Sequence, residues 1–199
     1  MKKTLHTVLI LTAVLATAAF ATTVQKLTFE EIVDHSVLIV EGQVASVTVI
    51  EDEGVVHSRV LIKVLDVLKG EYPGEFVELD FLGGKGEHRT IIVAGQDIPE
   101  AGEKGFYFVE NMDSPSVNPL TGWSQGHFRI KADLKGNEYL ETDIQHEVVE
   151  ITHNKNAVLA EKLRNMRFSH ALVEKAYFNP VTPEELRDAV SLFMAEQDQ

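Results

Sequence analysis

The chain has 199 residues, of which 44% are hydrophobic and 25% are charged. These ordinary globular values exclude a wholly disordered chain, a coiled coil and a collagen-like array. Because the chain has no cysteine, a disulfide scaffold, a thiol nucleophile and a cysteine-based metal site are also excluded. Acidic residues outnumber basic ones by 31 to 18, and the formal net charge of −13 disfavours nucleic acid and anionic membranes as partners.

Residues 1–21 have the pattern of a secretory signal peptide. Lys2 and Lys3 precede an apolar run, and Ala19-Phe20-Ala21 supplies the small residues of a signal peptidase site. The apolar run is shorter than the ~20 residues needed to span a bilayer. We therefore expect cleavage after Ala21, no membrane insertion of the mature chain, and a location in the periplasm or the medium.

Apolar and polar residues alternate over much of the segment from 37 to 142, as they do in antiparallel strands. Two long strands, 37–50 and 56–68, flank the turn residues Asp52-Glu53-Gly54 and predict a hairpin. Gly42 marks a bend or bulge in the first of them. Shorter strands are expected at 76–82, 89–94, 106–109 and 127–131, with an extension at 138–142.

Helices are predicted on both sides of this segment in the sequence. A capping box, in which a threonine pairs with a glutamate three residues later, starts one helix after Thr28 and another after Thr182. A further helix is expected over residues 156–168. The last helix carries an apolar stripe suited to packing on the rest of the domain, consisting of Leu186, Ala189, Val190 and Phe193.

Short strands separated by turns, without helices to connect parallel neighbours, predict an antiparallel barrel. We expect a mainly β fold in which residues 22–150 form an OB-like antiparallel β-barrel with a short N-terminal helix. Residues 151–199 are expected to form a helical appendage packed on that barrel. A two-sheet sandwich is the main alternative.

Four ordered sequence blocks carry a resemblance to known proteins: SVLIVEGQV (36–44), VLDVLKG (64–70), GEK (102–104) and QGHFRI (125–130). In this GxV…VLKG…GE…QGxFxV pattern, the chain resembles a widespread set of uncharacterised exported bacterial proteins over about residues 28 to 133. Its layout is also distantly similar to the netrin-like, OB-fold domain of the tissue inhibitors of metalloproteinases, which implies a barrel. In those inhibitors an N-terminal cysteine binds the metal of the target. This chain has no cysteine, so the resemblance does not carry that mechanism over.

Gly122-Trp123-Ser124-Gln125-Gly126 is a G-x-S-x-G motif, which in α/β-hydrolases places a catalytic serine on a turn between a strand and a helix. Here turn-like residues precede the motif and an alternating strand follows it. We therefore expect a loop that enters a strand, with Trp123 covering the barrel, and we keep serine catalysis as the less favoured alternative. Its partners would come from Asp133, Asp143, His146, His153 and His170.

The other polar patterns predict no cofactor and no metal site. The histidines lack the spacing of a close ligand pair, and we expect His57, His88 and His127 on a solvent-exposed face. A metal site assembled from distant histidines stays open. Glu51-Asp52-Glu53 lacks the ligand spacing of a calcium loop, although weak surface binding of calcium stays open too. Gly83-Gly84-Lys85-Gly86 precedes no helix and lacks a following serine or threonine, which excludes a phosphate-binding loop.

These observations favour an exported, non-catalytic binding module that contacts a protein or another envelope component. The candidate contact residues are aromatic residues and prolines in or near the loop 111–122, namely Trp123, Tyr107, Pro115 and Pro119. The first alternative is a protease inhibitor or protease-associated protein that acts through its shape or through a freed N-terminus near Thr22. A hydrolase that uses Ser124 is the third interpretation.

Overall fold

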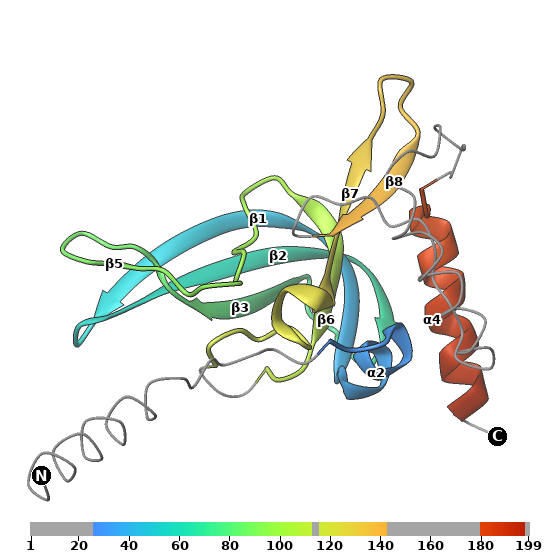
Figure 1. Ribbon diagram of the computed structural model, residues 1–199, viewed down its shortest axis with the longest axis horizontal. Coiled ribbons are helices and arrows are strands. Elements are labelled where there is room, and N and C mark those ends of the chain that lie inside the picture. The colour runs from blue at the N-terminus through green and yellow to red at the C-terminus, as the bar shows by residue number, and fades with distance from the viewer. Residues whose placement is uncertain (1–25, 113–115, 143–179, 198–199) are drawn as a thin grey trace, which may run out of the picture.

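The computed structural model describes residues 26–112, 116–142 and 180–197 (Figure 1). Within these ranges the chain forms one large antiparallel sheet, a small β-ribbon and two α-helices, so the fold is mainly β as expected. The predicted signal peptide, the predicted helix over 156–168 and the domain boundary at residue 150 lie outside the described residues.

Six strands make up the large sheet, in the order β3-β2-β1-β6-β7-β8, and each pair of neighbours is antiparallel. The strands are β1 (Leu38–Asp52), β2 (Val55–Lys69), β3 (Phe76–Leu82), β6 (Lys104–Val109), β7 (His127–Ala132) and β8 (Glu138–Thr142). The separate ribbon pairs β4 (Gly84–Lys85) with β5 (Thr90–Ile91).

β1 is shared by the two halves of the sheet. Its first part, Leu38 to Gln43, pairs with β6, and nearly its whole length pairs with β2. The register with β2 shifts between Glu41 and Gly42, which confirms the irregularity predicted at this glycine. Figure 1 shows β1 and β2 curving together to a tip that lies far from both helices.

Among the described residues, β3 and β8 are the outer strands of the sheet, and no strand pairing joins them. The antiparallel, mainly β architecture is therefore confirmed, whereas closure into an OB-like barrel stays a prediction. The strand expected over residues 89–94 is wrong in extent, because only Thr90–Ile91 is a strand. Its partner β4 has two residues and pairs with it in the separate ribbon, so the ladder cannot continue.

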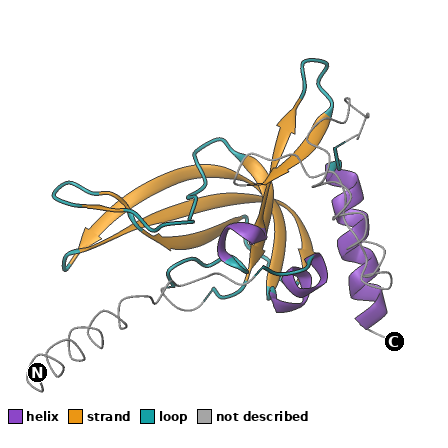
Figure 2. Ribbon diagram, viewed as in Figure 1, coloured by secondary structure: helices purple, strands orange, loops and turns teal. Residues whose placement is uncertain are grey.

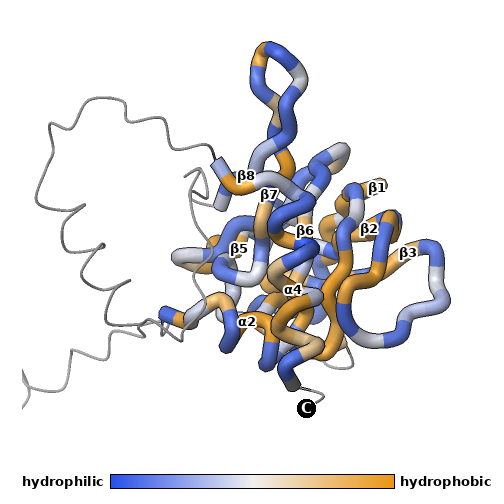
Figure 3. Tube along the Cα trace, turned by 90° about the vertical axis from the view of Figure 1, so that its right-hand side faces the viewer, coloured by the Kyte–Doolittle hydropathy of each residue, from blue (hydrophilic) through white to orange (hydrophobic). Residues whose placement is uncertain are grey.

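Apolar side chains cover both faces of the sheet. On one face, α2 (Phe29–His35) and α4 (Pro183–Gln197) pack over a cluster that includes Phe106, Phe108 and Phe128. On the other face, the alternate residues of the strands pack against loop residues such as Leu120. Figure 2 shows both helices at the end of the sheet that lies away from the β1–β2 hairpin tip, and Figure 3 shows them near each other in the view from that end.

The capping boxes predicted for the two helices are both present. Thr28 and Glu31 exchange side-chain hydrogen bonds with each other's backbone amides, and Thr182 and Glu185 do the same. The stripe of α4 packs on the sheet as expected, with Leu186, Val190 and Phe193 buried and Ala189 half-buried.

An ion pair adds to the docking of α4. Arg187 donates from Nη2 and Nε to Glu41 Oε2, over 2.6 and 2.9 Å, and Glu41 lies in the buried part of β1. Lys104 Nζ lies 3.3 Å from the other oxygen of the same carboxylate. Two cations therefore compensate the buried charge of Glu41.

Candidate functional site

The four predicted contact residues do not come together on an exposed surface. Tyr107 is fully buried, which contradicts its predicted place on such a surface. Pro119 is buried too, because its carbonyl accepts a hydrogen bond from the Glu110 amide over 2.9 Å and draws the loop onto the sheet. Trp123 is half-buried, and Pro115 lies outside the described residues.

Tyr107 belongs to a buried polar cluster next to the second apolar face. His127 and Arg129 come from β7, and Glu103 comes from the connection that leads into β6. Asp97, from the same connection, lies at the exposed edge of the cluster. The His127 ring stacks on the Tyr107 ring, with 4.8 Å between their centroids and 21° between their planes.

The prediction of a solvent-exposed His127 is wrong, since this residue is 1% exposed. The alternation in β7 does point His127 away from Phe128, but the connection before β6 covers that face as well. Of the other two histidines, His88 is exposed and His57 is half-buried.

Glu103 holds the cluster together. Its Oε2 accepts a hydrogen bond from Arg129 Nε over 2.8 Å, and its Oε1 lies 3.1 Å from His127 Nε2. Arg129 also donates to the carboxylate of Asp97 and, from Nη1 over 3.2 Å, to the backbone carbonyl of Thr142. A single buried guanidinium therefore fastens the connection to β7 at two carboxylates.

The ionisation of the cluster follows from these contacts. Burial raises the pKa of the Glu103 carboxyl, but the contacts with His127 and Arg129 outweigh burial and hold this pKa below its usual range. Burial, and secondarily the charge of Glu103, raises the pKa of the Tyr107 phenol. At neutral pH, Glu103 is therefore charged and Tyr107 is neutral. The charged Glu103 carboxylate binds Arg129 and so attaches the connection before β6 to β7.

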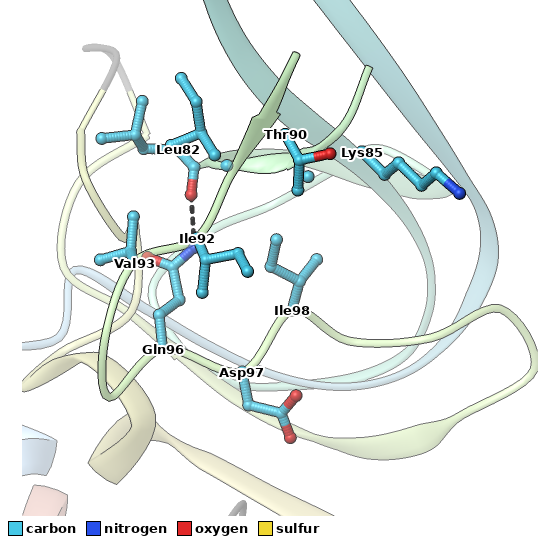
Figure 4. A pocket seen from close by; sticks show the side chains of 11 residues that line it. Leu82, Lys85, Thr90, Ile92, Val93, Gln96, Asp97 and Ile98 are labelled. Atoms are coloured by element: carbon cyan, nitrogen blue, oxygen red, sulfur yellow. Dashed lines mark hydrogen bonds between the residues drawn. The ribbon is translucent and has the colours of Figure 1, made fainter. Parts of the chain in front are cut away.

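The same connection also lines part of a pocket of about 310 Å³ (Figure 4). This volume is at the lower end of the range found for ligand pockets. Five of its eleven lining residues are aliphatic, namely Leu82, Ile91, Ile92, Val93 and Ile98. The polar side chains of the lining are Lys85, Thr90, Gln96 and Asp97. Asp97 thus lines the pocket and also pairs with Arg129 of the buried cluster.

Glycine at the end of β3 lets the chain form the wall of this pocket. Gly84 has a φ of +133°, and a Cβ at this position would lie 2.6 Å from Ser58 Oγ. Ser58 in turn donates to the carbonyl of Gly83 over 2.9 Å. The glycine-rich segment therefore packs closely against β2 where the β4–β5 ribbon begins.

Polar contacts fix the far end of the β4–β5 ribbon to the β1–β2 hairpin. The carboxylate of Glu51 accepts a hydrogen bond from the backbone amide of His88 over 2.9 Å. Arg89 donates to the carbonyl of Gly54 over 3.1 Å. The pocket wall is therefore attached to the sheet at both ends of the ribbon.

Gln96, one of the lining residues, carries a buried amide oxygen that has no partner in the described ranges. Its Nε2 donates to the Leu82 carbonyl over 2.8 Å. Because a carbonyl can only accept, this bond fixes the orientation of the amide and turns Oε1 away from Leu82. Oε1 is buried and has no hydrogen-bond partner in the part of the chain that the structure describes.

The G-x-S-x-G motif lies on a short 3₁₀ helix, η1 (Trp123–Gly126), that leads directly into β7. This order confirms the expected loop entering a strand and differs from the strand-to-helix turn of a nucleophile elbow. The candidate partners Asp143, His146, His153 and His170 lie outside the described residues.

Within the described ranges, no group of three or more histidine, aspartate or glutamate side chains is arranged to hold a metal ion. No helix in those ranges is both long and apolar enough to cross a membrane. Comparison of the chain with protein-family models, with curated proteins and with solved structures finds no match. The pocket and the buried cluster are therefore interpreted from their own chemistry.

Sequence reasoning missed both of these features. The cluster had one sequence signal, the alternation of His127 and Arg129 with apolar Phe128 and Ile130. The pocket had a weaker signal. Its apolar residues 91–93 form a run that is equally typical of a buried strand, so the sequence does not indicate a pocket there.

Proposed function

We propose that this protein is an exported, non-catalytic binding module that contacts a protein partner through the pocket lined by residues 82–98. The pocket itself is the observation that carries the proposal, because its aliphatic lining continues to the surface. Ile92 is 87% exposed and belongs to that lining, so it is contiguous with the pocket and is not an isolated surface residue. Covering such a surface removes apolar area from water, which favours association.

A binding role is supported by the way in which the polar groups near the pocket are used. Glu103 and Arg129 are engaged with each other and with the loop, which suits a rigid support for a binding surface. Ser124 lies on η1 ahead of a strand, a position that does not expose it above a sheet as a nucleophile elbow does. A pocket with aliphatic side chains in its wall is an arrangement that receives a side chain of a partner.

Export is supported by the pattern of the first 21 residues, with cleavage expected between Ala21 and Thr22. An OB-like barrel is supported by β1, which serves both halves of the sheet and bends at Gly42. The net charge of −13 favours basic or neutral partners in the periplasm or the medium.

A pair of matched substitutions tests the proposal. Ile92→Asp places a carboxylate at the mouth of the pocket, and Leu134→Asp makes a comparable change at a fully exposed residue in the turn between β7 and β8. Each chain is used to recover partners from an envelope extract, and each recovered protein is then purified for measurement of its Kd. We expect Ile92→Asp to weaken binding by about tenfold or more, because a charge would have to be buried at the contact.

Leu134→Asp is expected to bind as the original chain does. Urea unfolding of all three chains shows whether they are equally folded. Equal binding by the Ile92→Asp and Leu134→Asp chains would refute a role for the pocket in partner contact.

A further inference from the structure

We propose that the partner pairs with the outer edge of β5 as an extended strand, with an acidic residue opposite Arg89 and one side chain in the adjoining pocket. This inference rests on the proposed function and specifies the backbone conformation and the charge of the partner segment. In this kind of contact, which is strand addition, main-chain hydrogen bonds supply affinity and pockets for side chains supply specificity.

The register of the ribbon shows which backbone groups of β5 point outward. The Gly86 amide donates to the Arg89 carbonyl over 2.8 Å, and Ile91 pairs with β4 two residues further on. Hydrogen-bonded pairs of an antiparallel ladder recur at every second residue, so Arg89 and Ile91 direct their amides and carbonyls toward β4. Thr90 lies between them, and its amide and carbonyl therefore point away from β4.

The carbonyl of Ile91 gives the direction of one more group. A Cβ at Gly83 would lie 2.9 Å from the Ile91 oxygen, so this carbonyl faces the glycines that lead into β4. The described peptide bonds are all trans, and the amide that follows a carbonyl in a planar trans peptide points the opposite way. The Ile92 amide therefore points outward, as both backbone groups of Thr90 do.

These three outward groups are open to another chain. Ile92 is 87% exposed as a whole residue, and Thr90 is exposed too. Within the described ranges, no protein group forms a hydrogen bond with the amide or carbonyl of Thr90 or with the amide of Ile92. Residues 90–94 contain neither proline nor a charged residue, which are common protections of a strand edge. The edge is therefore suited to pairing with an extended segment.

The composition of this segment and the position of the pocket favour the same occupant. Residues 90–93 are all β-branched and prefer extended backbone, yet β5 itself ends at Ile91. The same four residues line part of the pocket. Side chains of a strand point alternately to its two faces, so a strand on this edge brings side chains next to the pocket.

The charges beside the edge indicate an acidic residue in the partner strand. Although the whole chain has a net charge of −13, residues 84–92 carry two cations, Lys85 and Arg89, and one anion, Glu87. Arg89 donates to the backbone carbonyl of Gly54, and neither cation has a carboxylate within ion-pair distance in the described ranges. A carboxylate opposite Arg89 in an antiparallel ladder would pair with it across the strands.

Peptides of one sequence test the pairing through their backbone. The reference is acetyl-Val-Ile-Val-Glu-Val-amide, whose third residue lies opposite Thr90 when its glutamate lies opposite Arg89 in an antiparallel ladder. The N–H of the third residue then donates to the Thr90 carbonyl, whereas the N–H of the second residue points away from β5. N-methylation of the third or of the second residue gives two probes of equal composition.

Binding is followed through the amide NMR signals of Thr90 and Ile92 at millimolar peptide concentrations. We expect N-methylation of the third residue to raise the Kd by at least about fivefold, which is the effect of one ordinary hydrogen bond. N-methylation of the second residue should raise it by less than about twofold. Replacing the glutamate of the reference peptide by glutamine should raise the Kd by about twofold, as expected for an exposed ion pair.

Two substitutions of Thr90 test the same edge from the side of the protein. Thr90→Pro removes an outward N–H and no hydrogen bond to β4, whereas Thr90→Val keeps the N–H and the branched shape. We expect Thr90→Pro to weaken binding of the reference peptide by at least about fivefold and Thr90→Val by less than about twofold. Amide signals outside the ribbon that match the original chain show that both variants are folded.

The outcomes separate this inference from the proposed function. Equal effects of the two N-methyl groups on binding would overturn strand addition and leave the pocket as a contact for a side chain. Absence of any peptide-induced shift of the Thr90 and Ile92 amides would overturn it too, while the comparison of Ile92→Asp with Leu134→Asp still decides the role of the pocket. Shifts of these amides on raising the protein concentration alone would show that a second copy occupies the edge, which would overturn its assignment to a different partner.

Discussion

Gly126 lies where the chain leaves η1 and enters β7, and two backbone carbonyls lie close to the position that a Cβ would occupy. A Cβ at this position would lie 2.6 Å from the oxygen of Thr121 and 3.0 Å from that of Phe108. Backbone atoms cannot move aside as the end of a flexible side chain can. The second glycine of the G-x-S-x-G motif is therefore required by packing, independently of any chemistry at Ser124.

This packing predicts opposite results for two substitutions in one motif. Gly126→Ala should lower the free energy of unfolding by about 2 kcal/mol, because the added methyl group overpacks the site. Ser124→Ala should change it by less than about 0.5 kcal/mol, because Ser124 is only half-buried. Urea denaturation of both variants measures the two values, and a larger loss for Ser124→Ala would contradict the packing explanation.

The residues of β7 show what alternation can and cannot reveal. The pattern of His127 to Ile130 correctly separates Phe128 and Ile130, which join the core under the helices, from His127 and Arg129. It does not reveal that the second face is covered as well. That cover is the connection that carries Asp97 and Glu103, and its contacts with β7 span about thirty residues, beyond the reach of a local pattern.

At the scale of elements, α4 was predictable because its signals are local. The capping box at Thr182, the proline that follows and the apolar spacing all lie within the helix or next to it. The partners of its apolar stripe were not predictable, since they include Ile32 and Val33 of α2 at the other end of the chain. The ion pair between Arg187 and Glu41 likewise joins residues 146 positions apart.

Two leucines of α4 test whether the helix is docked as described. Leu186 is fully buried and Leu192 is 53% exposed, so Leu→Ala at both sites makes the same chemical change in the same helix. Leu186→Ala should cost about 3 kcal/mol through lost burial and the cavity left behind. Leu192→Ala should cost less than about 0.5 kcal/mol, because the exposed site has little to lose and alanine has high helix propensity.

Urea unfolding compares the two variants. Similar losses of stability for both, whether large or small, would contradict the docking of α4 through the face that contains Leu186. A difference of more than about 1.5 kcal/mol in the expected direction would support it.

The β4–β5 ribbon shows the opposite case, an element whose length depends on its partner. Residues 90–94 have the composition of a strand, and composition alone predicts a longer ladder. The ladder stops because β4 provides two residues, and the chain then turns through Gly95. The pocket lies where this ladder ends, so its location follows from pairing that the sequence does not encode locally.

At the scale of the whole molecule, the two apolar faces of the sheet differ at their β6–β7 end. The face under the helices stays apolar, with Phe106 and Phe128 as neighbours across the strands. On the other face, Tyr107 and His127 are the corresponding neighbours, and the charged groups of Glu103 and Arg129 follow. Where the connection before β6 covers this face, the contacts are therefore between paired charges instead of apolar side chains.

The burial of Tyr107 beside Glu103 predicts that the free energy of unfolding depends on pH in the alkaline range. Burial and the charge of Glu103 raise the pKa of its phenol in the folded protein, whereas in the unfolded chain the phenol titrates near its usual value of about 10. Above this pH, the unfolded chain loses a proton that the folded protein keeps. The stabilisation from Tyr107 is therefore complete below about pH 10 and falls as the pH rises further.

The variant Tyr107→Phe separates the pH dependence due to Tyr107 from that due to lysines, because the variant and the original chain have the same lysines. At pH 7, Tyr107→Phe should be as stable as the original chain or more stable, because Oη is buried without a hydrogen-bond partner in the described ranges. Between pH 10 and 11, the original chain should lose about 1 kcal/mol more than Tyr107→Phe, close to the limit for one proton. Urea unfolding from pH 7 to 11 measures both curves, and no cysteine is present to titrate in the same range. Curves that stay parallel up to pH 11 would show that Tyr107 is accessible to ionisation, and would contradict both the buried cluster and the packing of the connection over it.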